Sequence, residues 1–246
     1  MRDIIGVIPA AGQGMRLGLP FPKELWPLPG QKKYVPVAFR SVEVLRAANI
    51  TRIAIITSPI KPAIMNYFGD GSRFGVEIIY ACQEVFSEKG KSPGLSRAID
   101  CAYPILESRR VAFVMPDTYV YPKDCFRQLI DGAGNADLVL GLFLTDKPHK
   151  FGMVKTHGSI VLEIIDKPTK TDLRLMWGIM LWSSRFSDHL RACMKDNAPD
   201  FATVMNRAIT KNMSVRAIEI VGGKYLDFGT YEDVLIAEEF IKSLEE

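Results

Sequence analysis

The sequence lacks the residues and patterns that mark disulfide-stapled and zinc-binding proteins. Its 246 residues include only four cysteines and three histidines, and no two cysteines form a C-x-x-C pair. Scattered cysteines predict free thiols in a reducing compartment, and isolated histidines argue against an imidazole metal site. The residues concerned are Cys82, Cys101, Cys125, Cys193, His149, His157 and His189.

Strong net charge and long apolar runs are also missing. The formal charge is +3 without a stripe of Lys or Arg, so the sequence does not indicate a nucleic-acid partner. The longest nearly apolar stretch, residues 138–144, is far shorter than the roughly 20 residues that span a bilayer. We therefore expect no nucleic acid, no membrane and a cytoplasmic location.

What is present is the composition of an ordinary globular protein. Apolar residues make up 48% and charged residues 24% of the chain, and this length can bury one large α/β core. No repeat, low-complexity tract or clear linker interrupts the sequence. We expect one domain over residues 1–246.

Strand-like and helix-like segments alternate through the first half, which predicts a parallel sheet with crossover helices. The second half predicts a small antiparallel or mixed layer added to it. The expected strands are 4–8, 52–57, 76–80, 111–115, 137–144, 153–155, 160–165, 173–182 and 214–220. The expected helices are 35–48, 59–68, 92–106, 122–133, 184–196, 199–211 and a last one that begins at Thr230.

A glycine-rich loop follows the first expected strand. It carries Gly12, Gly14 and Gly18, then the cations Arg16 and Lys23. Glycines let backbone N–H groups approach phosphate oxygens, and the cations supply the charge that a triphosphate needs. The loop does not fit the dinucleotide fingerprint G-x-G-x-x-G, because its third glycine comes one residue late, and the Walker Gly-Lys-Ser/Thr is absent.

Two aspartates are further candidates. Asp117 lies directly beyond an expected buried strand, at the sheet edge where ligands bind in this architecture. Asp227 stands far along the sequence, near the last expected helix. Alone, Asp117 could equally cap a turn and Asp227 a helix.

Five segments together resemble one family. The loop resembles the G-x-G-x-R and Pro-Lys signature of the nucleotidylyltransferases that activate sugar 1-phosphates. Four later segments resemble further motifs of that family in the same order, so the resemblance covers nearly the whole chain. They are Pro116-Asp117, Phe151-Gly152-Met153-Val154, Asp166-Lys167-Pro168 and Asp227-Phe228-Gly229-Thr230.

This resemblance implies a doubly wound, mostly parallel α/β sheet of Rossmann-like type, with a small mixed sugar-binding layer. Residues 1–145 would form mainly the nucleotide half and 146–246 mainly the sugar-phosphate half. It also implies Mg²⁺-dependent attack of a sugar 1-phosphate on an NTP, with pyrophosphate released and no covalent enzyme intermediate. Family members often assemble, so a homo-oligomer is compatible with this reading.

The resemblance assigns roles to individual positions. Arg16 and Lys23 would neutralise the NTP phosphates, Lys167 would hold the attacking phosphate, and Asp117 and Asp227 would bind Mg²⁺. The remaining nucleotide positions would be Ala11, Gly12, Gly14, Met15, Gln83 and Gly94. The sugar-phosphate positions would be Gly152, Asp166, Lys167, Trp177 and Gly178.

Some positions depart from the family pattern. Ala11 replaces the usual Gly, Met15 a Thr or Ser, and Asp166 a Glu that is one methylene longer. Trp177 replaces a smaller residue and would crowd the sugar pocket. The spacer between Gln83 and Gly94 is also longer than usual. These departures bear on the identity of the substrate more than on the type of reaction.

The leading interpretation is therefore a transfer from dTTP or UTP to glucose 1-phosphate. A cytidylyltransferase that acts on another phosphorylated sugar or alcohol is the nearest alternative, because Ala10-Ala11-Gly12 also occurs there. A regulatory homologue that binds nucleotide sugars without turnover stays open. A nicotinamide-dependent oxidoreductase is disfavoured, since no acidic residue ends the second expected strand.

Overall fold

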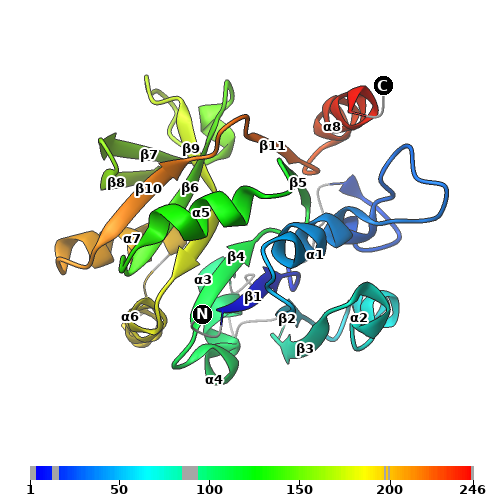
Figure 1. Cartoon of the computed structure of the whole chain (residues 1–246), viewed down its shortest axis with the longest axis horizontal. Helices are drawn as coiled ribbons and strands as arrows, with labels where there is room; N and C mark the ends of the chain where they lie inside the picture. Colours follow the sequence, from blue (N-terminus) through cyan, green and yellow to red (C-terminus); the bar gives the residue numbers. More distant parts are fainter. Residues whose placement is uncertain (1–3, 13–16, 85–93, 197, 199, 245–246) are drawn as a thin grey trace.

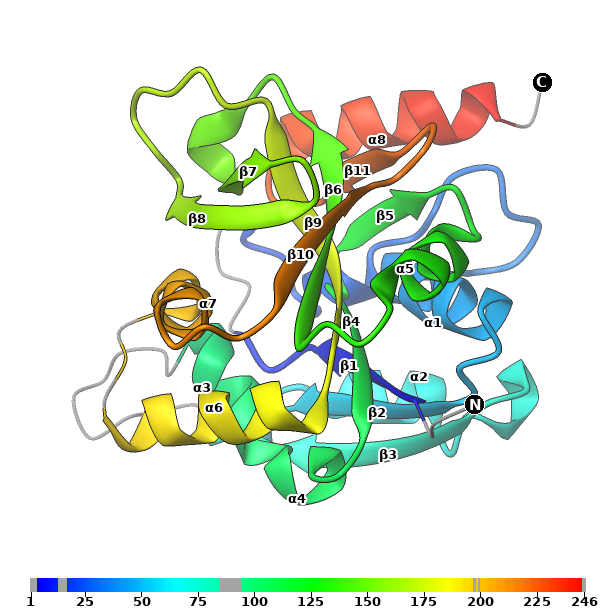
Figure 2. The ribbon, with the colours of Figure 1, turned by 60° about the vertical axis from the view of Figure 1, so that its left-hand side comes forward.

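The fold centres on one nine-stranded sheet with the strand order β3-β2-β1-β4-β9-β6-β10-β8-β7 (Figures 1 and 2). The computed structural model describes residues 4–12, 17–84, 94–196, 198 and 200–244. The nine strands are β1 Ile4–Pro9, β2 Arg52–Thr57, β3 Glu77–Cys82, β4 Arg110–Val114, β6 Leu138–Leu144, β7 Gly152–His157, β8 Ile160–Asp166, β9 Leu175–Trp182 and β10 Val215–Glu219. Two more strands, β5 Thr118–Tyr121 and β11 Lys224–Asp227, form a separate two-stranded sheet.

The first half of the sheet is parallel, as the alternation of segments predicts. β1 pairs in parallel with β2 and β4, and β2 pairs in parallel with β3. β1, β2 and β4 are short runs rich in Ile, Val and Ala that are buried almost throughout, whereas the edge strand β3 is only partly buried. Apolar runs buried on both faces are typical of parallel strands covered by helices.

The second half of the sheet is mixed, as expected, but it continues the first half, so the sheet as a whole is not mostly parallel. β9 lies between β4 and β6 and runs antiparallel to both. β7 and β8 also pair antiparallel, and with β10 they extend the same sheet instead of forming an added layer. The apolar run of β9 specifies burial on both faces, but neither its direction nor its neighbours.

Helices cover both faces of the sheet (Figure 2). One core cluster joins a face of the sheet to α1 Val37–Ala47, α2 Pro62–Phe68 and α5 Cys125–Ala133. The other joins the opposite face to α3 Gly94–Cys101, α4 Tyr103–Leu106, α6 Ser184–Lys195 and α7 Phe201–Thr210.

The single helix expected over 92–106 is two helices in the part that the structure describes. α3 ends at Cys101, and α4 begins at Tyr103 with Pro104 in its first turn. Proline has no N–H to donate and its ring clashes with the preceding turn, so it starts a new helix here instead of continuing the old one.

The small sheet of β5 and β11 was not expected from the sequence. The two strands are antiparallel, with Asp227 opposite Thr118 and Leu226 opposite Tyr119. The last helix, α8 Tyr231–Ser243, lies beside this sheet (Figure 1). A third core cluster, around the fully buried Phe228, joins α8 to β5 and to the start of α1.

α8 begins as predicted. The Thr230 hydroxyl caps it by accepting a hydrogen bond from the Asp233 backbone N–H at 3.2 Å. All four cysteines are free thiols, which confirms the prediction of unpaired cysteines. None of the helices in the described segments combines the length and apolar composition that crossing a membrane needs.

Phe228 should matter to stability more than its neighbours on the surface of α8. Phe228→Ala removes a ring with no exposed surface from the third core cluster, and we expect the free energy of unfolding to fall by about 3–5 kcal/mol. Leu235→Ala, at a side chain that is 67% exposed on α8, should change it by less than about 0.5 kcal/mol. Urea denaturation of both variants tests this, and equal losses would contradict it.

Candidate active site

A cavity of about 390 Å³ collects side chains from both halves of the chain. Its walls come from the start of α3, the segment after β4, the ends of β7, β8 and β9, and β11. The sequence-predicted residues that line it are Gly94, Asp117, Gly152, Asp166, Lys167, Trp177 and Asp227. The predicted metal positions and most of the predicted sugar-phosphate positions therefore share one cavity.

Asp117 and Asp227 are brought together by the small sheet. Asp117 immediately precedes β5, and the register places Asp227 of β11 opposite Thr118. The Phe228 N–H also donates to the Asp117 carbonyl oxygen at 3.0 Å. Burial raises the pKa of the Tyr225 hydroxyl well above its ordinary value, and the charges of both carboxylates raise it further.

Lys23, from the short helix η2 Lys23–Leu25, forms an ion pair with Asp117. Only 13% of the lysine side chain and 8% of the aspartate side chain are exposed. Burial acts to lower the pKa of Lys23, but the nearby carboxylates, Asp117 foremost, together outweigh it and the pKa is raised. The structure therefore joins a predicted phosphate ligand to a predicted metal ligand.

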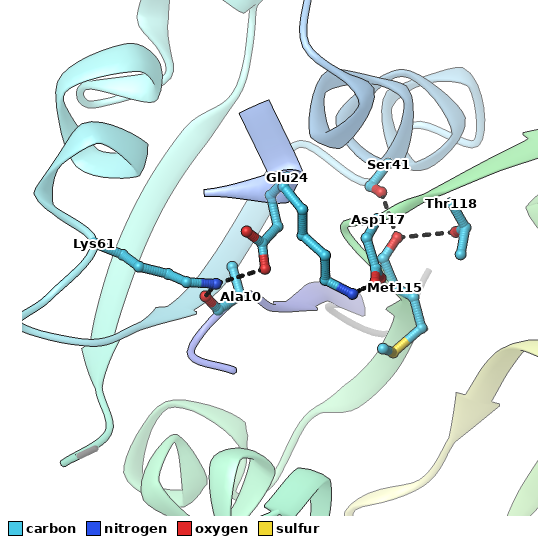
Figure 3. A network of polar contacts seen from close by, with 8 residues as sticks. Ala10, Glu24, Ser41, Lys61, Met115, Asp117 and Thr118 are labelled. Atoms are coloured by element: carbon cyan, nitrogen blue, oxygen red, sulfur yellow. Dashed lines mark hydrogen bonds and ion pairs between the residues drawn. The ribbon is translucent and has the colours of Figure 1, made fainter. Parts of the chain in front are cut away.

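The segment around Asp117 is held by hydroxyl groups (Figure 3). Ser41 of α1 and Thr118 both donate to the Met115 carbonyl oxygen, at 2.8 and 3.1 Å. These bonds fix the turn between β4 and β5, because they satisfy a carbonyl that the strand ladder leaves free. The carboxylate of Asp117 is thereby aimed from a rigid turn.

A buried ion pair supports the glycine-rich loop (Figure 3). Lys61, just before α2, donates to Glu24 Oε1 at 2.7 Å and to the Ala10 carbonyl oxygen at 3.2 Å. The side chains of Glu24 and Lys61 are only 3% and 4% exposed. Burial raises the pKa of Glu24, and the charge of Lys61 opposes that rise. This pair ties the entry of the loop to η2, which carries Lys23.

The loop itself is described only in part, because Gly14, Met15 and Arg16 lie outside the described residues. Ala11 is buried at 5% exposure. A Cβ at Gly12 would meet nothing within 4 Å among the described atoms, and Gly12 is not one of the glycines with a positive φ. Among the described residues, neither packing nor a positive φ therefore requires glycine at this position.

Gln83 follows β3, and its backbone N–H donates to the Thr57 carbonyl oxygen at 2.8 Å. The residue is 9% exposed, and its side-chain Nε2 has no hydrogen-bond partner among the described residues. Buried amide groups are normally paired, so this one is available to a ligand. Gln83 is not among the residues that line the cavity, whereas Gly94, at φ +81°, is one of them.

Gly152 is required by the position of Trp177. A Cβ at Gly152 would lie 2.2 Å from the indole Nε1 of Trp177, so only glycine fits. The indole also makes an edge-to-face contact with Phe201 at 6.1 Å between ring centroids. The expected crowding of this side of the cavity is thus present. Gly178 packs instead under Tyr225 and Phe143 and is not part of the lining.

Asp166 and Lys167 lie at the end of β8, on the open side of the cavity. Their side chains are 44% and 61% exposed and form an ion pair at 3.5 Å. The Lys167 backbone has a φ of +46°, and its N–H donates to the Phe151 carbonyl oxygen at 3.0 Å. That bond pins the lysine to the turn before β7.

Sequence reasoning missed Lys150, which also lines the cavity. Its ammonium donates to both carboxylate oxygens of Asp233 on α8, at 2.7 and 2.9 Å. Burial acts to raise the pKa of Asp233, but the hydrogen bonds from Lys150 and Thr230 outweigh it and lower the pKa. The two residues are 83 positions apart, and no local pattern links them.

The donor set at Asp117 and Asp227 fits a hard divalent cation that phosphates help to hold. Among the described residues, no group of three His, Cys, Asp or Glu side chains could hold a metal alone. Mg²⁺ commonly uses one or two carboxylates and takes its other ligands from phosphates and water. The ammonium of Lys23 already lies against Asp117, which shows that this position accepts positive charge.

Comparisons with known proteins agree with one another. A family model described as nucleotidyl transferase matches residues 5–243. The glucose-1-phosphate thymidylyltransferase of Mycolicibacterium smegmatis is 25% identical over an alignment of 252 residues. The alignment covers 98% of this chain and 83% of that protein. The enzyme of the same name from Neisseria meningitidis is 26% identical over 256 residues, again covering 98% and 83%.

Solved structures share the fold. A Bacillus anthracis protein assigned as a glucose-1-phosphate thymidylyltransferase, crystallised with a sucrose, aligns with a TM-score of 0.82 at 22% identity and covers 96% of this chain and 94% of that one. The UTP-bound UGPase from Acinetobacter baumannii aligns with a TM-score of 0.77 at 20% identity over 100% and 95%.

The Glu24–Lys61 pair predicts a pH-dependent loss of stability. Lys61→Met leaves Glu24 buried without its partner, and we expect a loss of about 3–5 kcal/mol at neutral pH. The pKa of Glu24 then rises further above its ordinary value of 4.5. Above that value the folded variant holds more protons than the unfolded chain, so its free energy of unfolding falls as pH rises.

Urea denaturation at about pH 5 and about pH 8 measures this loss, which should be larger at the higher pH. The double variant Lys61→Met with Glu24→Gln is the matched control, because it has no carboxylate to titrate at this position. An equal loss at both pH values in the single variant would show that Glu24 does not titrate as described.

Proposed function

Because this chain belongs to the nucleotidyl transferase family, we propose that it transfers a nucleotidyl group from dTTP or UTP to a sugar 1-phosphate, with glucose 1-phosphate the first candidate. The observation that carries the proposal is the single cavity that Asp117 and Asp227 share with Asp166 and Lys167. A carboxylate pair for a metal and a lysine for a phosphate are what a reaction between two anionic substrates needs. The names of the relatives support the same substrates.

The chemistry is an in-line displacement. An oxygen of the sugar phosphate attacks the α-phosphorus of the NTP, the new P–O bond forms, and the bond to the bridging oxygen breaks as pyrophosphate leaves. No covalent enzyme intermediate is needed, so catalysis consists of positioning and charge neutralisation.

Each candidate residue has a role in that displacement. Lys167 holds the attacking phosphate and offsets its repulsion from the triphosphate, while Asp166 accepts hydrogen bonds from sugar hydroxyls. Arg16 and Lys23 neutralise the departing pyrophosphate. Asp117 and Asp227 would hold Mg²⁺, which supplies further positive charge to the phosphates when it is bound.

The nucleotide would lie against the glycine-rich loop and the ends of β2 and β3. Gly12 leaves open space for a phosphate, and Ala11, Gly14, Met15 and Gly94 complete the proposed contacts. The side-chain amide of Gln83, whose Nε2 has no partner in the described part of the chain, suits the polar edge of a pyrimidine. This amide is the reason to prefer dTTP or UTP among nucleotides.

A second acceptor class is favoured by one contact. Trp177 lies against Gly152 and narrows the acceptor side of the cavity. An acceptor other than a hexose phosphate, such as another phosphorylated sugar or alcohol, is therefore the alternative within the same reaction type. CTP would be its donor, since the Ala10-Ala11-Gly12 sequence also resembles that of cytidylyltransferases.

The first experiment is pyrophosphate release with Mg²⁺ over a grid of NTPs and phosphorylated acceptors, including glucose 1-phosphate. Release that requires both dTTP or UTP and a sugar 1-phosphate is the expected result. Release with CTP and another phosphorylated alcohol would select the alternative. Silence over the whole grid, with NTP binding retained in calorimetry, would instead support a regulatory homologue that binds nucleotide sugars without turnover.

Lys167→Ala should impair use of the acceptor. Losing a charge-assisted contact to a phosphate costs about 1.5–3 kcal/mol, or about 10- to 150-fold in kcat/KM for the acceptor. Lys170→Ala is the matched control, because Lys170 is exposed nearby and is not among the residues that line the cavity. Steady-state kinetics that show equal effects of the two substitutions would remove Lys167 from the acceptor site.

Gly12→Ala should separate folding from nucleotide binding. The new methyl group meets no described atom within 4 Å, so the urea midpoint should stay at that of the parent chain. A phosphate that packs on the loop would meet the methyl group, and we expect UTP or dTTP to bind about tenfold more weakly, or about 1.4 kcal/mol. Calorimetry with unchanged affinity would show that no ligand approaches Gly12.

A further inference from the structure

Lys23 has two possible partners, the NTP phosphates and the Asp117 carboxylate, and it cannot form its best contact with both at once. The proposed function gives its ammonium to the NTP phosphates, but in the structure it forms an ion pair with the Asp117 carboxylate. Both side chains are largely buried, with 13% and 8% of their surface exposed, so water screens this contact only weakly. The ion pair therefore defines a state of the free protein.

The ammonium also lies beside the carboxylates that would bind a metal. Asp117 and Asp227 are the carboxylates that the β5–β11 register brings together, and the charges of Asp227 and Glu24 add to that of Asp117 at Lys23. A divalent cation bound to Asp117 would be repelled by the Lys23 ammonium, which pairs with the same carboxylate. Metal and ammonium consequently oppose each other at this position.

A triphosphate changes that balance. The lysine side chain is a flexible stem with a compact charge, and it can turn from a carboxylate to a phosphate oxygen without movement of its backbone. Once the lysine has turned to the phosphate, the Asp117 carboxylate is no longer paired with the ammonium and can bind a metal. The phosphates also supply ligands that the two carboxylates alone lack.

We propose that the ammonium of Lys23 neutralises Asp117 in the free protein. A divalent metal then binds weakly at Asp117 until the phosphates of a nucleoside triphosphate pair with Lys23 instead. Linkage makes this reciprocal, because nucleotide that favours the metal must itself bind more tightly when the metal is present. The inference rests on the proposed function, since it assumes a metal at Asp117 and Asp227 and a triphosphate within reach of Lys23.

The test is Mn²⁺ binding to the full chain without nucleotide, measured from the electron paramagnetic resonance signal of free Mn²⁺. Lys23→Met keeps most of the stem and removes the charge, and it should bind Mn²⁺ at least about tenfold more tightly than the parent chain. Lys23→Gln is a second variant that can still donate to Asp117, and circular dichroism confirms that each is folded. Lys170→Met is the matched control for loss of one positive charge and should leave Mn²⁺ affinity unchanged.

A second arm adds α,β-methylene-UTP, which cannot undergo attack with loss of pyrophosphate. The nucleotide should strengthen Mn²⁺ binding in the parent chain by more than it does in the Lys23 variants. Adding Asp227→Asn to Lys23→Met should remove the gain in Mn²⁺ affinity, which places the gain at the carboxylate pair.

Equal Mn²⁺ affinity in the parent chain and both Lys23 variants would overturn the inference, as would tight binding to the parent chain without nucleotide. A gain that survives Asp227→Asn would overturn it too, because the metal would then lie elsewhere. Failure of the proposed function is distinguishable: the Mn²⁺ gain in the Lys23 variants would persist while the pyrophosphate grid stayed silent.

Discussion

The pairing of β5 with β11 is the constraint on which the site depends. Each strand has only four residues, and an isolated pair of that length is marginal in water. Phe228 and α8 supply the apolar contacts that keep the pair in place. Because this register sets Asp227 opposite Thr118, the packing of the last helix determines how far apart the two candidate metal ligands lie.

The sequence predicts the parallel half of the fold well, because its strands are short apolar runs between turn residues and are buried on both faces. β1, β2 and β4 begin and end within two residues of their expected bounds. The place of β9 could not be predicted, since its apolar run would be equally buried at several positions in a sheet. The pairing of β5 with β11 could not be predicted either, because strands that are far apart in the sequence produce no local pattern that would show them to be partners.

The residues of the candidate site also differ in whether the sequence could predict their position. Asp117 could be placed in advance because it follows a buried strand of the parallel half, and the carboxyl ends of parallel strands gather at one edge of a sheet. Asp166 ends an antiparallel strand and could be expected there only from the family resemblance. The pairs Lys61–Glu24 and Lys150–Asp233 could not be placed in advance, because a lysine that pairs with a distant carboxylate has the same local sequence as a solvated one. Trp177 could be expected to crowd the cavity, but its contact with Gly152 follows only from the fold.

The lysines around the cavity share one property that the sequence does not reveal. Lys23, Lys150 and Lys167 each contact an aspartate, respectively Asp117, Asp233 and Asp166. Pairing lowers the cost of holding like charges close together before any anion binds. A phosphate that binds here must therefore exchange partners with a carboxylate instead of meeting a bare cation. Each exchange would release a carboxylate, and at Asp117 the released group is the one that we propose for a metal, so binding of the anion would prepare the position for the cation.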